Sequence, residues 1–262
     1  MQKPPITSLN NPLVKQARAL RHRKGRRESG LFLVEGIHHV GEAVDAGWEL
    51  ETVLYAPDML TSTFGRDLVS RLASLPQPVS AQVMESLAGK DNPQGILALA
   101  RQRRIQLAEL NSIRTGAALV SPQDPGNVGT ILRTLDAVGA DALFLLDGGA
   151  DLYHPTVVRA SMGTLFWKPV IQTSFGEFIR WSRSGEYQLI GTSAHGDVEY
   201  HIFVPRLPWI LVLGREQKGL STEQMNDCDV TVSLPMKGRA SSLNLAVAAG
   251  VLLFQYSQHI GV

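Results

Sequence analysis

The sequence predicts an α/β protein made of two domains. Short apolar runs alternate with patterns of helical period along the chain, which is typical of strands and helices packed in layers. The chain has 262 residues, a length that suits either one large domain or two of ordinary size, and we favour two. Residues 101–110 are charged and then amphipathic, without a strong strand pattern, so we expect the boundary there. The predicted domains are residues 1–105 and 106–262.

The first domain is predicted to be a small α/β unit. Apolar runs that suit buried strands alternate in it with segments of helical pattern. The expected strands are 31–34, 52–55 and 95–100, and the expected helices are 37–46 and 66–73.

The second domain is predicted to contain a parallel sheet, because strand and helix patterns alternate again from Ala117 to Tyr256. Ligands of such sheets collect beyond the carboxyl ends of the strands, so the loops after the strands are where chemistry is expected. The expected strands are 117–120, 143–146, 188–191, 210–213 and 230–234, and the expected helices are 129–138, 174–184 and 243–256.

Composition narrows the class of protein. Hydrophobic residues make up 44% of the chain and charged residues 19%, as in globular rather than disordered or fibrous proteins. No apolar run reaches the roughly 18 residues that cross a bilayer, and residues 1–5 hold no apolar signal-peptide core, so we expect a cytoplasmic protein without a membrane partner. The single cysteine, Cys228, excludes an internal disulfide. The seven histidines show no ligand-like spacing, so no metal is expected.

Basic residues are concentrated in two short stretches, although the formal net charge is only +1. One stretch is residues 15–27, which contain no acidic residue, and the other holds Arg101, Arg103 and Arg104. Each alone could be a solvated helix face or a charged linker. Two clusters that flank one domain favour a polyanion as partner. The residues of the first stretch expected to bind it are Arg23, Lys24, Arg26 and Arg27.

Three polar loops that contain glycine each follow a predicted strand of the second domain. They span residues 121–129, 214–221 and 234–244. Taken singly, each could be an ordinary turn whose polar side chains cap the next helix or face solvent. Three such loops in one domain are not explained in this way, and together they indicate a ligand site. The candidate caps are Asn127, Ser242 and Asn244, and the candidate solvated residues are Glu216 and Lys218.

These loops resemble the three signature motifs of the SpoU/TrmH family of the SPOUT superfamily. The first motif is similar to residues 127–133 (NVGTILR) and the second to residues 212–220 (VLGREQKGL). The third is similar to residues 234–238 (LPMKG) followed by 242–248 (SLNLAVA). Where the third motif usually begins with Ile this chain has Leu234, a change that conserves volume.

The first hundred residues resemble, more loosely, the L30e-like RNA-binding domain that many members directed at ribosomal RNA carry. The matching pieces are residues 8–12 (SLNNP) and 32–36 (FLVEG), and residues 158–163 (VRASMG) are similar to another run common in the family. The resemblance implies a parallel-sheet SPOUT domain with a deep trefoil knot, preceded by a smaller L30e-like α/β domain.

The function implied by the resemblance is that of an S-adenosylmethionine-dependent RNA methyltransferase acting on a ribose 2'-hydroxyl as a homodimer. An L30e-like domain favours large-subunit ribosomal RNA over tRNA as the substrate. A tRNA 2'-O-methyltransferase, or a non-catalytic RNA-binding protein on the same scaffold, remains an alternative. A nicotinamide or nucleotide enzyme is disfavoured, because neither G-x-G-x-x-G nor G-x-x-x-x-G-K-[ST] follows a predicted strand.

The resemblance also implies roles for particular residues. Arg133 is often described as the general base in this family, but a guanidinium stays protonated in proteins. We therefore expect Arg133 to grip the neighbouring phosphate while phosphate or water takes the proton. Backbone groups are expected to hold the cofactor at Leu213, Gly214, Gly219, Leu234, Met236 and Leu243. The side chains expected to face the ribose are Asn127, Arg133, Glu216, Ser242 and Asn244, and Arg159 is expected to bind RNA.

Overall fold

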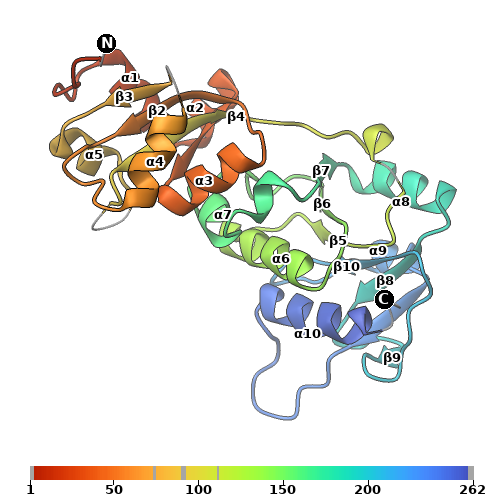
Figure 1. Cartoon of the computed structure of the whole chain (residues 1–262). Coiled ribbons are helices and arrows are strands. Elements are labelled where there is room, and N and C mark those ends of the chain that lie inside the picture. Colours follow the sequence, from red (N-terminus) through yellow and green to blue (C-terminus); the bar gives the residue numbers. More distant parts are fainter. Residues whose placement is uncertain (1–2, 73–74, 90–92, 111, 259–262) are drawn as a thin grey trace. The chain divides into compact units, whose positions relative to one another are not determined.

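The structure, a computed structural model, describes residues 3–72, 75–89, 93–110 and 112–258. Its contacts divide the chain into two compact units, and Figure 1 labels most of their elements. The first unit is Met1–Arg103 with Leu152–Trp167, and the second is Arg104–Asp151 with Lys168–Val262. The first unit gives way to the second after Arg103, near the boundary that the sequence predicts after residue 105. No sequence pattern predicts that residues 152–167 group with the first unit.

A four-stranded mixed sheet forms the centre of the first unit. Its strands are β1 (Leu31–Glu35), β2 (Leu50–Tyr55), β3 (Pro76–Pro78) and β4 (Ile96–Arg101), in the order β1-β4-β2-β3. β4 is antiparallel to β1 and β2, whereas β2 and β3 are parallel. The helices are α1 (Pro12–Ala19), α2 (Arg23–Ser29), α3 (Ile37–Asp45), α4 (Thr63–Arg71) and α5 (Ala81–Leu87).

The elements predicted for this unit are confirmed, each within three residues of its expected bounds. The core joins Val14 of α1 and Met84 of α5 to Leu33, Leu54 and Leu99 of the sheet. The sequence patterns did not reveal α1, α2, α5 or β3. α2 and β3 are short, and neither contains an apolar run that would mark it.

Arg26 is buried, so the prediction that it binds RNA is wrong. Its side chain is 1% exposed, and Nη1 donates to the carbonyl oxygens of Leu20 (2.8 Å) and Arg21 (2.9 Å), just beyond the end of α1. A buried guanidinium is tolerated because backbone acceptors replace water. Basic composition alone did not reveal which arginine turns inward. The other residues of that set are exposed: Arg23, Lys24 and Arg27.

Residues 152–167 pack on the first unit through aromatic rings. The ring centroid of Tyr153 lies 4.6 Å from that of Phe32, and that of Phe166 lies 5.3 Å from that of Trp48. The Tyr153 hydroxyl accepts from the N–H of Arg103 and donates to its carbonyl oxygen. This packing explains why the segment groups with the first unit. Its helices are α7 (Pro155–Ala160) and the 3-10 helix η2 (Thr164–Phe166).

A parallel sheet forms the centre of the second unit, as predicted, but it has seven strands where the sequence patterns indicated five. Its strands are β5 (Thr115–Val120), β6 (Ala142–Leu146), β7 (Val170–Thr173), β8 (Gln188–Thr192), β9 (Val198–Glu199), β10 (Trp209–Leu213) and β11 (Val230–Ser233). The order is β7-β6-β5-β10-β8-β11-β9, and every pairing is parallel. The central strands β5, β6 and β10 are completely buried, which is typical of a parallel sheet covered on both faces.

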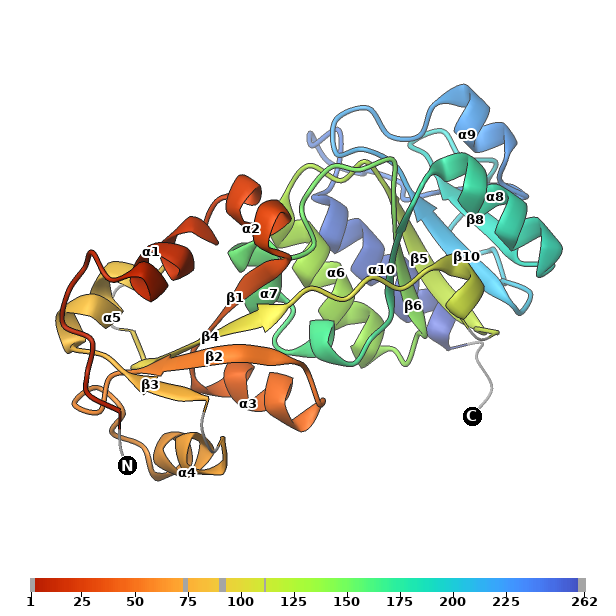
Figure 2. The ribbon, with the colours of Figure 1, turned by 90° about the horizontal axis from the view of Figure 1, so that it is seen from above.

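Helices cover the two faces of this sheet (Figure 2). Phe178 of α8 (Phe175–Ser184) packs on Phe144 of β6, with ring centroids 5.1 Å apart, and Ile179 packs against the same core. α6 (Pro125–Ala137) and α10 (Leu245–Ser257) contact each other, and they also contact β6 and β10, respectively. The strand β7, the short strand β9 and the helix α9 (Thr222–Asn226) were not predicted, since none has a long apolar pattern. No helix in the described ranges is both long and apolar enough to span a membrane.

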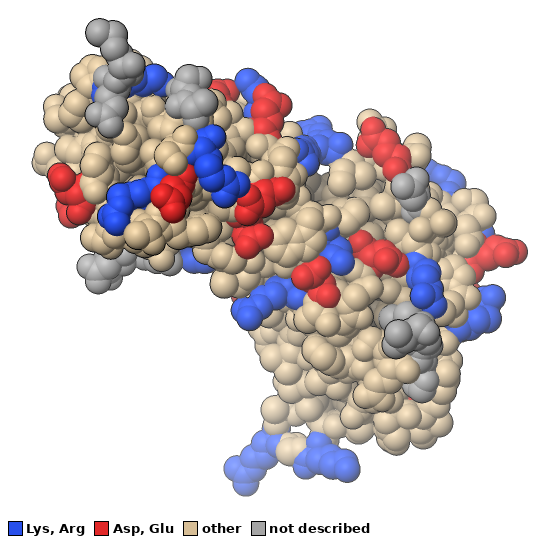
Figure 3. Space-filling view, viewed as in Figure 1, with Lys and Arg blue, Asp and Glu red and all other residues tan. Residues whose placement is uncertain are grey.

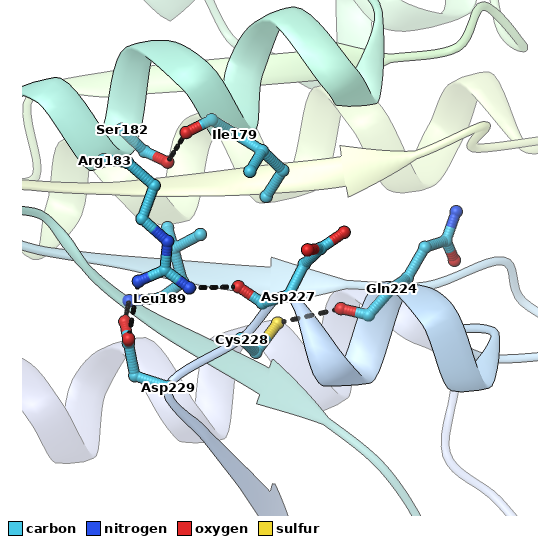
Figure 4. A network of polar contacts seen from close by, with 8 residues as sticks. All are labelled: Ile179, Ser182, Arg183, Leu189, Gln224, Asp227, Cys228 and Asp229. Atoms are coloured by element: carbon cyan, nitrogen blue, oxygen red, sulfur yellow. Dashed lines mark hydrogen bonds and ion pairs between the residues drawn. The ribbon is translucent and has the colours of Figure 1, made fainter.

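A polar network holds α8 against the segment that leads into β11 (Figure 4). Arg183 of α8 pairs with Asp229 at 2.6 Å and donates to the carbonyl oxygen of Asp227 at 2.7 Å. Asp229 also accepts from the N–H of Leu189 at 2.7 Å. Burial, with smaller contributions from the two aspartates, raises the pKa of the Cys228 thiol to about 12, so the thiol stays protonated at neutral pH. Cys228 therefore acts here as a small packing residue.

Candidate functional site

A cavity of about 500 Å³ lies beyond the carboxyl ends of β5 and β10, two adjacent parallel strands. From β5 the chain continues to β6 and β7 on one side of the sheet, whereas β8 and β11 lie on the side of β10. Parallel sheets bind ligands where the strand order reverses in this way, and the volume is that of a small-molecule site. The lining residues are Gln123, Asp124, Asn127, Arg215, Glu216, Gln217, Lys218 and Asn244.

The loop after β5 feeds α6 earlier than the sequence pattern suggests. Asp124 is the N-cap and accepts from the N–H of Gly126 at 2.7 Å, and Pro125 occupies the first helical position. Proline favours this position because its fixed φ suits the helix and it lacks an N–H to satisfy. The prediction that Asn127 caps the helix is therefore wrong. Asn127 lies in the first turn, 5% exposed, and its side chain is available to the cavity.

The carboxylate of Glu216 joins the loops that follow β5 and β10. Oε1 accepts from the N–H groups of Gln123 and Asp124, each at 3.1 Å, and Oε2 accepts from Gln123 at 3.1 Å. Asn127 Nδ2 donates to Oε1 at 3.4 Å. Hydrogen bonds to an ionised acceptor are stronger than neutral ones. This single side chain therefore holds the two loops at a set separation.

Asn244 connects the third loop to the other two. Its Nδ2 donates to Oδ1 of Asn127 at 2.9 Å. Its own Oδ1 accepts from the N–H groups of Ala246 and Val247, at 2.8 and 3.3 Å, as the N-cap of α10. The expectation that Asn244 starts a helix is confirmed. A chain of hydrogen bonds thus runs from Glu216 through Asn127 to Asn244, with one residue in each of the three polar loops (214–221, 121–129 and 234–244).

Hydrogen bonding keeps the Glu216 carboxylate ionised. Burial by itself raises its pKa, but the N–H groups of Asp124, Glu216 itself and Gln123, with the amide of Asn127, outweigh burial and lower the pKa below its ordinary value. Each of these donors stabilises the charged form. An ionised acceptor is what the two loops need in order to stay together.

The structure brings three of the five residues expected to face the ribose to the cavity, namely Asn127, Glu216 and Asn244. Arg133, on α6, and Ser242, in the loop before α10, are exposed and lie outside the cavity lining. Within the described ranges no group of three or more His, Cys, Asp or Glu could hold a metal ion. Five further lining residues were not predicted as site residues. Arg215, Gln217 and Lys218 belong to the second motif, and Gln123 and Asp124 precede the first motif in the same loop.

None of the six residues expected to hold a cofactor is part of the cavity lining. Leu213 ends β10, and the loop after it closes tightly, since a Cβ on Gly214 would stand 2.0 Å from the carbonyl carbon of Gly219. Leu234 is half-buried at the end of β11. Met236 and Leu243, in the loop between β11 and α10, are each 39% exposed.

Glu216→Gln is expected to lower the free energy of unfolding by about 1–2 kcal/mol at neutral pH, because a neutral amide replaces a hydrogen-bonded carboxylate. Since the folded-state pKa of Glu216 is lowered, its contribution is fully present above the ordinary value of 4.5 and is lost as pH falls through the lowered folded value. Urea unfolding of both proteins at several pH values measures this. Glu223→Gln, at an exposed position of α9, is the control. If the difference in free energy of unfolding between the wild type and Glu216→Gln stays constant down to acid pH, the lowered pKa of Glu216 is contradicted.

Two models of known families match this chain. The model of the SpoU rRNA Methylase family matches residues 115–254, which include the cavity lining and all seven parallel strands. The model of the MRM3-like substrate binding domain matches residues 11–98, within the first unit.

Similar proteins extend along nearly the whole chain. A 23S rRNA (uridine(2479)-2'-O)-methyltransferase of Streptomyces viridochromogenes is 34% identical, over 95% of this chain and 90% of its own length. A 23S rRNA (guanosine(2553)-2'-O)-methyltransferase of Bacillus subtilis is 28% identical, over 95% and 97%. The crystal structure of an rRNA methyltransferase from Sinorhizobium meliloti with bound AdoMet, that is S-adenosylmethionine, has a TM-score of 0.89 at 35% identity and covers 99% of both chains. The chain belongs to the SpoU rRNA methylase family.

Proposed function

We propose that the protein transfers the methyl group of S-adenosylmethionine to a ribose 2'-hydroxyl of large-subunit ribosomal RNA. The observation that carries this proposal is the chain of hydrogen bonds from Glu216 through Asn127 to Asn244 at a cavity between β5 and β10. These residues lie in the parts of the chain that match the family of methylases. Relatives named as 23S rRNA 2'-O-methyltransferases support ribosomal RNA as the substrate class.

The reaction is an in-line displacement in which the ribose oxygen bonds to the methyl carbon, the carbon–sulfur bond breaks and the hydroxyl proton leaves. S-adenosylmethionine supplies a methyl group activated by a positive sulfur. The protein has to align the hydroxyl with that group and to help the proton leave. Asn127 and Asn244 offer amide groups in fixed orientations, because each already bonds within the network. No metal takes part in this scheme.

Arg133 and Ser242 are proposed to contact RNA from outside the cavity lining. Both are exposed, so a bound nucleotide can reach them. Arg133 would bind the adjacent phosphate with two parallel hydrogen bonds and so fix the ribose, while phosphate or water accepts the proton. Ser242 would hold the ribose from the loop before α10. That loop projects from the surface and carries basic side chains, the exposed Lys237 and Arg239 (Figure 3).

The cofactor is proposed to be held mainly by the backbone of the loops after β10 and β11. The residues concerned are Leu213, Gly214, Gly219, Leu234, Met236 and Leu243. Met236 and Leu243 would also bury their exposed side chains against it. The deep trefoil knot expected of this domain remains a prediction, as does the assignment of the first unit as the L30e-like domain. A protein that modifies ribosomal RNA would act in the cytoplasm.

Asn244→Asp tests the proposed site without removing the helix cap. The aspartate keeps the oxygen that accepts from Ala246 and Val247 but loses the N–H donor to Asn127. We expect methyl transfer to fall about 100-fold, the scale seen when a positioning group is lost, with the melting temperature nearly unchanged. Arg133→Ala should lower methyl transfer by a similar factor, because the side chain that binds the phosphate is lost.

The assay is tritium transfer to ribosomal RNA from cells that lack the gene, followed by mapping of the 2'-O-methyl position. Methylation of tRNA and not of ribosomal RNA would favour the tRNA alternative. No transfer to either RNA, despite cofactor binding, would favour a non-catalytic RNA-binding protein and overturn the proposal.

The exposed basic residues of α2 are proposed to bind phosphates of the substrate, together with Arg159 of α7. Arg23, Lys24 and Arg27 are exposed, and Arg159 is half-buried. Changing the three exposed residues to Ala should weaken RNA binding. It should also flatten the plot of log affinity against log salt by roughly two units, since each phosphate contact on single-stranded RNA contributes about 0.7. Cofactor binding should not change.

Filter binding between about 50 and 200 mM salt measures this slope. Arg26→Met is the contrasting variant, because Arg26 is buried: it should lower stability and leave the slope unchanged. An unchanged affinity in the triple variant would mean that α2 is only a solvated surface.

A homodimer is proposed to form through α10. Three of its apolar side chains lie on one exposed stripe, spaced by four and three residues: Val247 (51% exposed), Val251 (38%) and Phe254 (55%). A stripe of this kind on a helix that also packs inward is typical of a surface buried by a partner.

Val251→Asp should convert a dimer to a monomer in light scattering, because it would bury a charge in the interface. The matched control is Phe64→Asp, at a 53% exposed position of the first unit, which should stay dimeric. A wild-type protein that is monomeric and fully active at the assay concentration would contradict the dimer.

A further inference from the structure

We infer that Gly149 is a positioning residue of the methyl-transfer site, acting through the backbone that binds Glu216. The inference rests on the proposed function where enzyme activity is measured, whereas hydrogen exchange of backbone amides tests it without that function. Gly149 lies in the turn after β6, outside the three motif loops and outside the cavity lining. Its effect therefore depends on what it touches.

The turn after β6 lies against the loop after β5, because the two strands are parallel neighbours. Ser121 N–H donates to the carbonyl oxygen of Leu146 at 2.8 Å, and its hydroxyl donates to that of Asp147 at 3.2 Å. Ala150 N–H donates to the carbonyl oxygen of Pro122 at 2.6 Å. These hydrogen bonds from and to the turn after β6 thus hold the loop that supplies N–H donors to Glu216.

The Pro122 carbonyl and the Gln123 N–H belong to one peptide group. On its carbonyl side this group accepts from Ala150, and on its N–H side it donates to both carboxylate oxygens of Glu216, each at 3.1 Å. A peptide group is rigid and planar, so moving the carbonyl must also move the N–H. The position of residues 149 and 150 therefore determines how the Gln123 N–H meets Glu216, and through Glu216 how Asn127 is held.

Only glycine fits at position 149. A Cβ there would stand 2.3 Å from the carbonyl oxygen of Pro122 and 2.9 Å from the carbonyl carbon of Ser121, both backbone atoms that cannot rotate away. The φ of Gly149 is also positive, at 104°. Its neighbour Gly148 has a positive φ of 76°, but a Cβ on Gly148 would meet no atom within 4 Å. Both glycines have a positive φ, but only at position 149 would a Cβ also meet the Pro122 carbonyl.

This difference provides a matched pair of variants, Gly149→Ala and Gly148→Ala. Both should lose some stability, measured as a lower melting temperature, because each has a positive φ. Only Gly149→Ala should also displace the 122–123 peptide group. We expect its kcat to fall at least ~10-fold, since a displacement of about 1 Å in a site can cost up to about 100-fold. Its KM for RNA and its Kd for S-adenosylmethionine should stay within about 3-fold of wild type. Gly148→Ala should keep its kcat.

Hydrogen exchange of the Gln123 and Asp124 amides, followed by NMR, is the measurement that needs no turnover. In the wild type and in Gly148→Ala, these amides should be protected from exchange by Glu216. In Gly149→Ala they should exchange faster than in Gly148→Ala when the two variants are compared under conditions of equal global stability. If the wild type shows this protection but does not methylate RNA, the proposed function fails while the positioning role of Gly149 stands.

Equal protection and equal kcat in the two alanine variants would overturn the inference. If Gly149→Ala does not fold, Ala150→Pro replaces it. That change deletes the N–H that donates to Pro122 and adds no atom at position 149. It should give the same fast exchange at Gln123, and unchanged exchange in this variant would equally overturn the inference.

Discussion

The Glu216 carboxylate is bound by backbone N–H groups of a neighbouring loop, and the candidate site depends on this interaction. The acceptor lies after β10, and the donors, Gln123 and Asp124, lie after β5. Parallel pairing brings the two loops to the same edge of the sheet, but the strands do not determine how far apart the loops stand. The carboxylate does so, and its lowered pKa keeps it ionised. Asn127 and Asn244 then extend the order to the start of α10.

Several parts of this arrangement could be predicted from the sequence because they depend on local patterns. The parallel sheet follows from alternating strand and helix patterns, and the three polar loops follow from their positions after predicted strands. The roles of Glu216 and Asn244 in the site follow from the resemblance to the SpoU/TrmH motifs. The start of α6 was placed too late, since apolar periodicity outweighed the cap signal of Asp124 with Pro125. Gly149 could not be singled out, because its importance comes from contact with Pro122, which is distant in sequence.

Features that depend on tertiary packing were not visible in the sequence. Arg26 looks like its basic neighbours, yet it turns inward to carbonyl oxygens at the end of α1. In the sequence, residues 152–167 come between β6 and β7 of the parallel sheet, yet they pack by aromatic contacts in the first unit. That unit contains the match to the MRM3-like substrate binding domain. That segment begins two residues after Ala150. The turn that supports the Glu216 loop is therefore joined by a short piece of chain to the first unit.

A double-mutant cycle of Glu216→Gln and Asn244→Asp, read as kcat/KM for methylation of ribosomal RNA, tests the central claim most directly. The two side chains share Asn127 as their hydrogen-bond partner. If the three residues act as a unit, either change alone disrupts the alignment, and the double variant should be little worse than the more damaged single variant. Losses in the double variant that equal the product of the two single losses would show independent side chains and contradict the account.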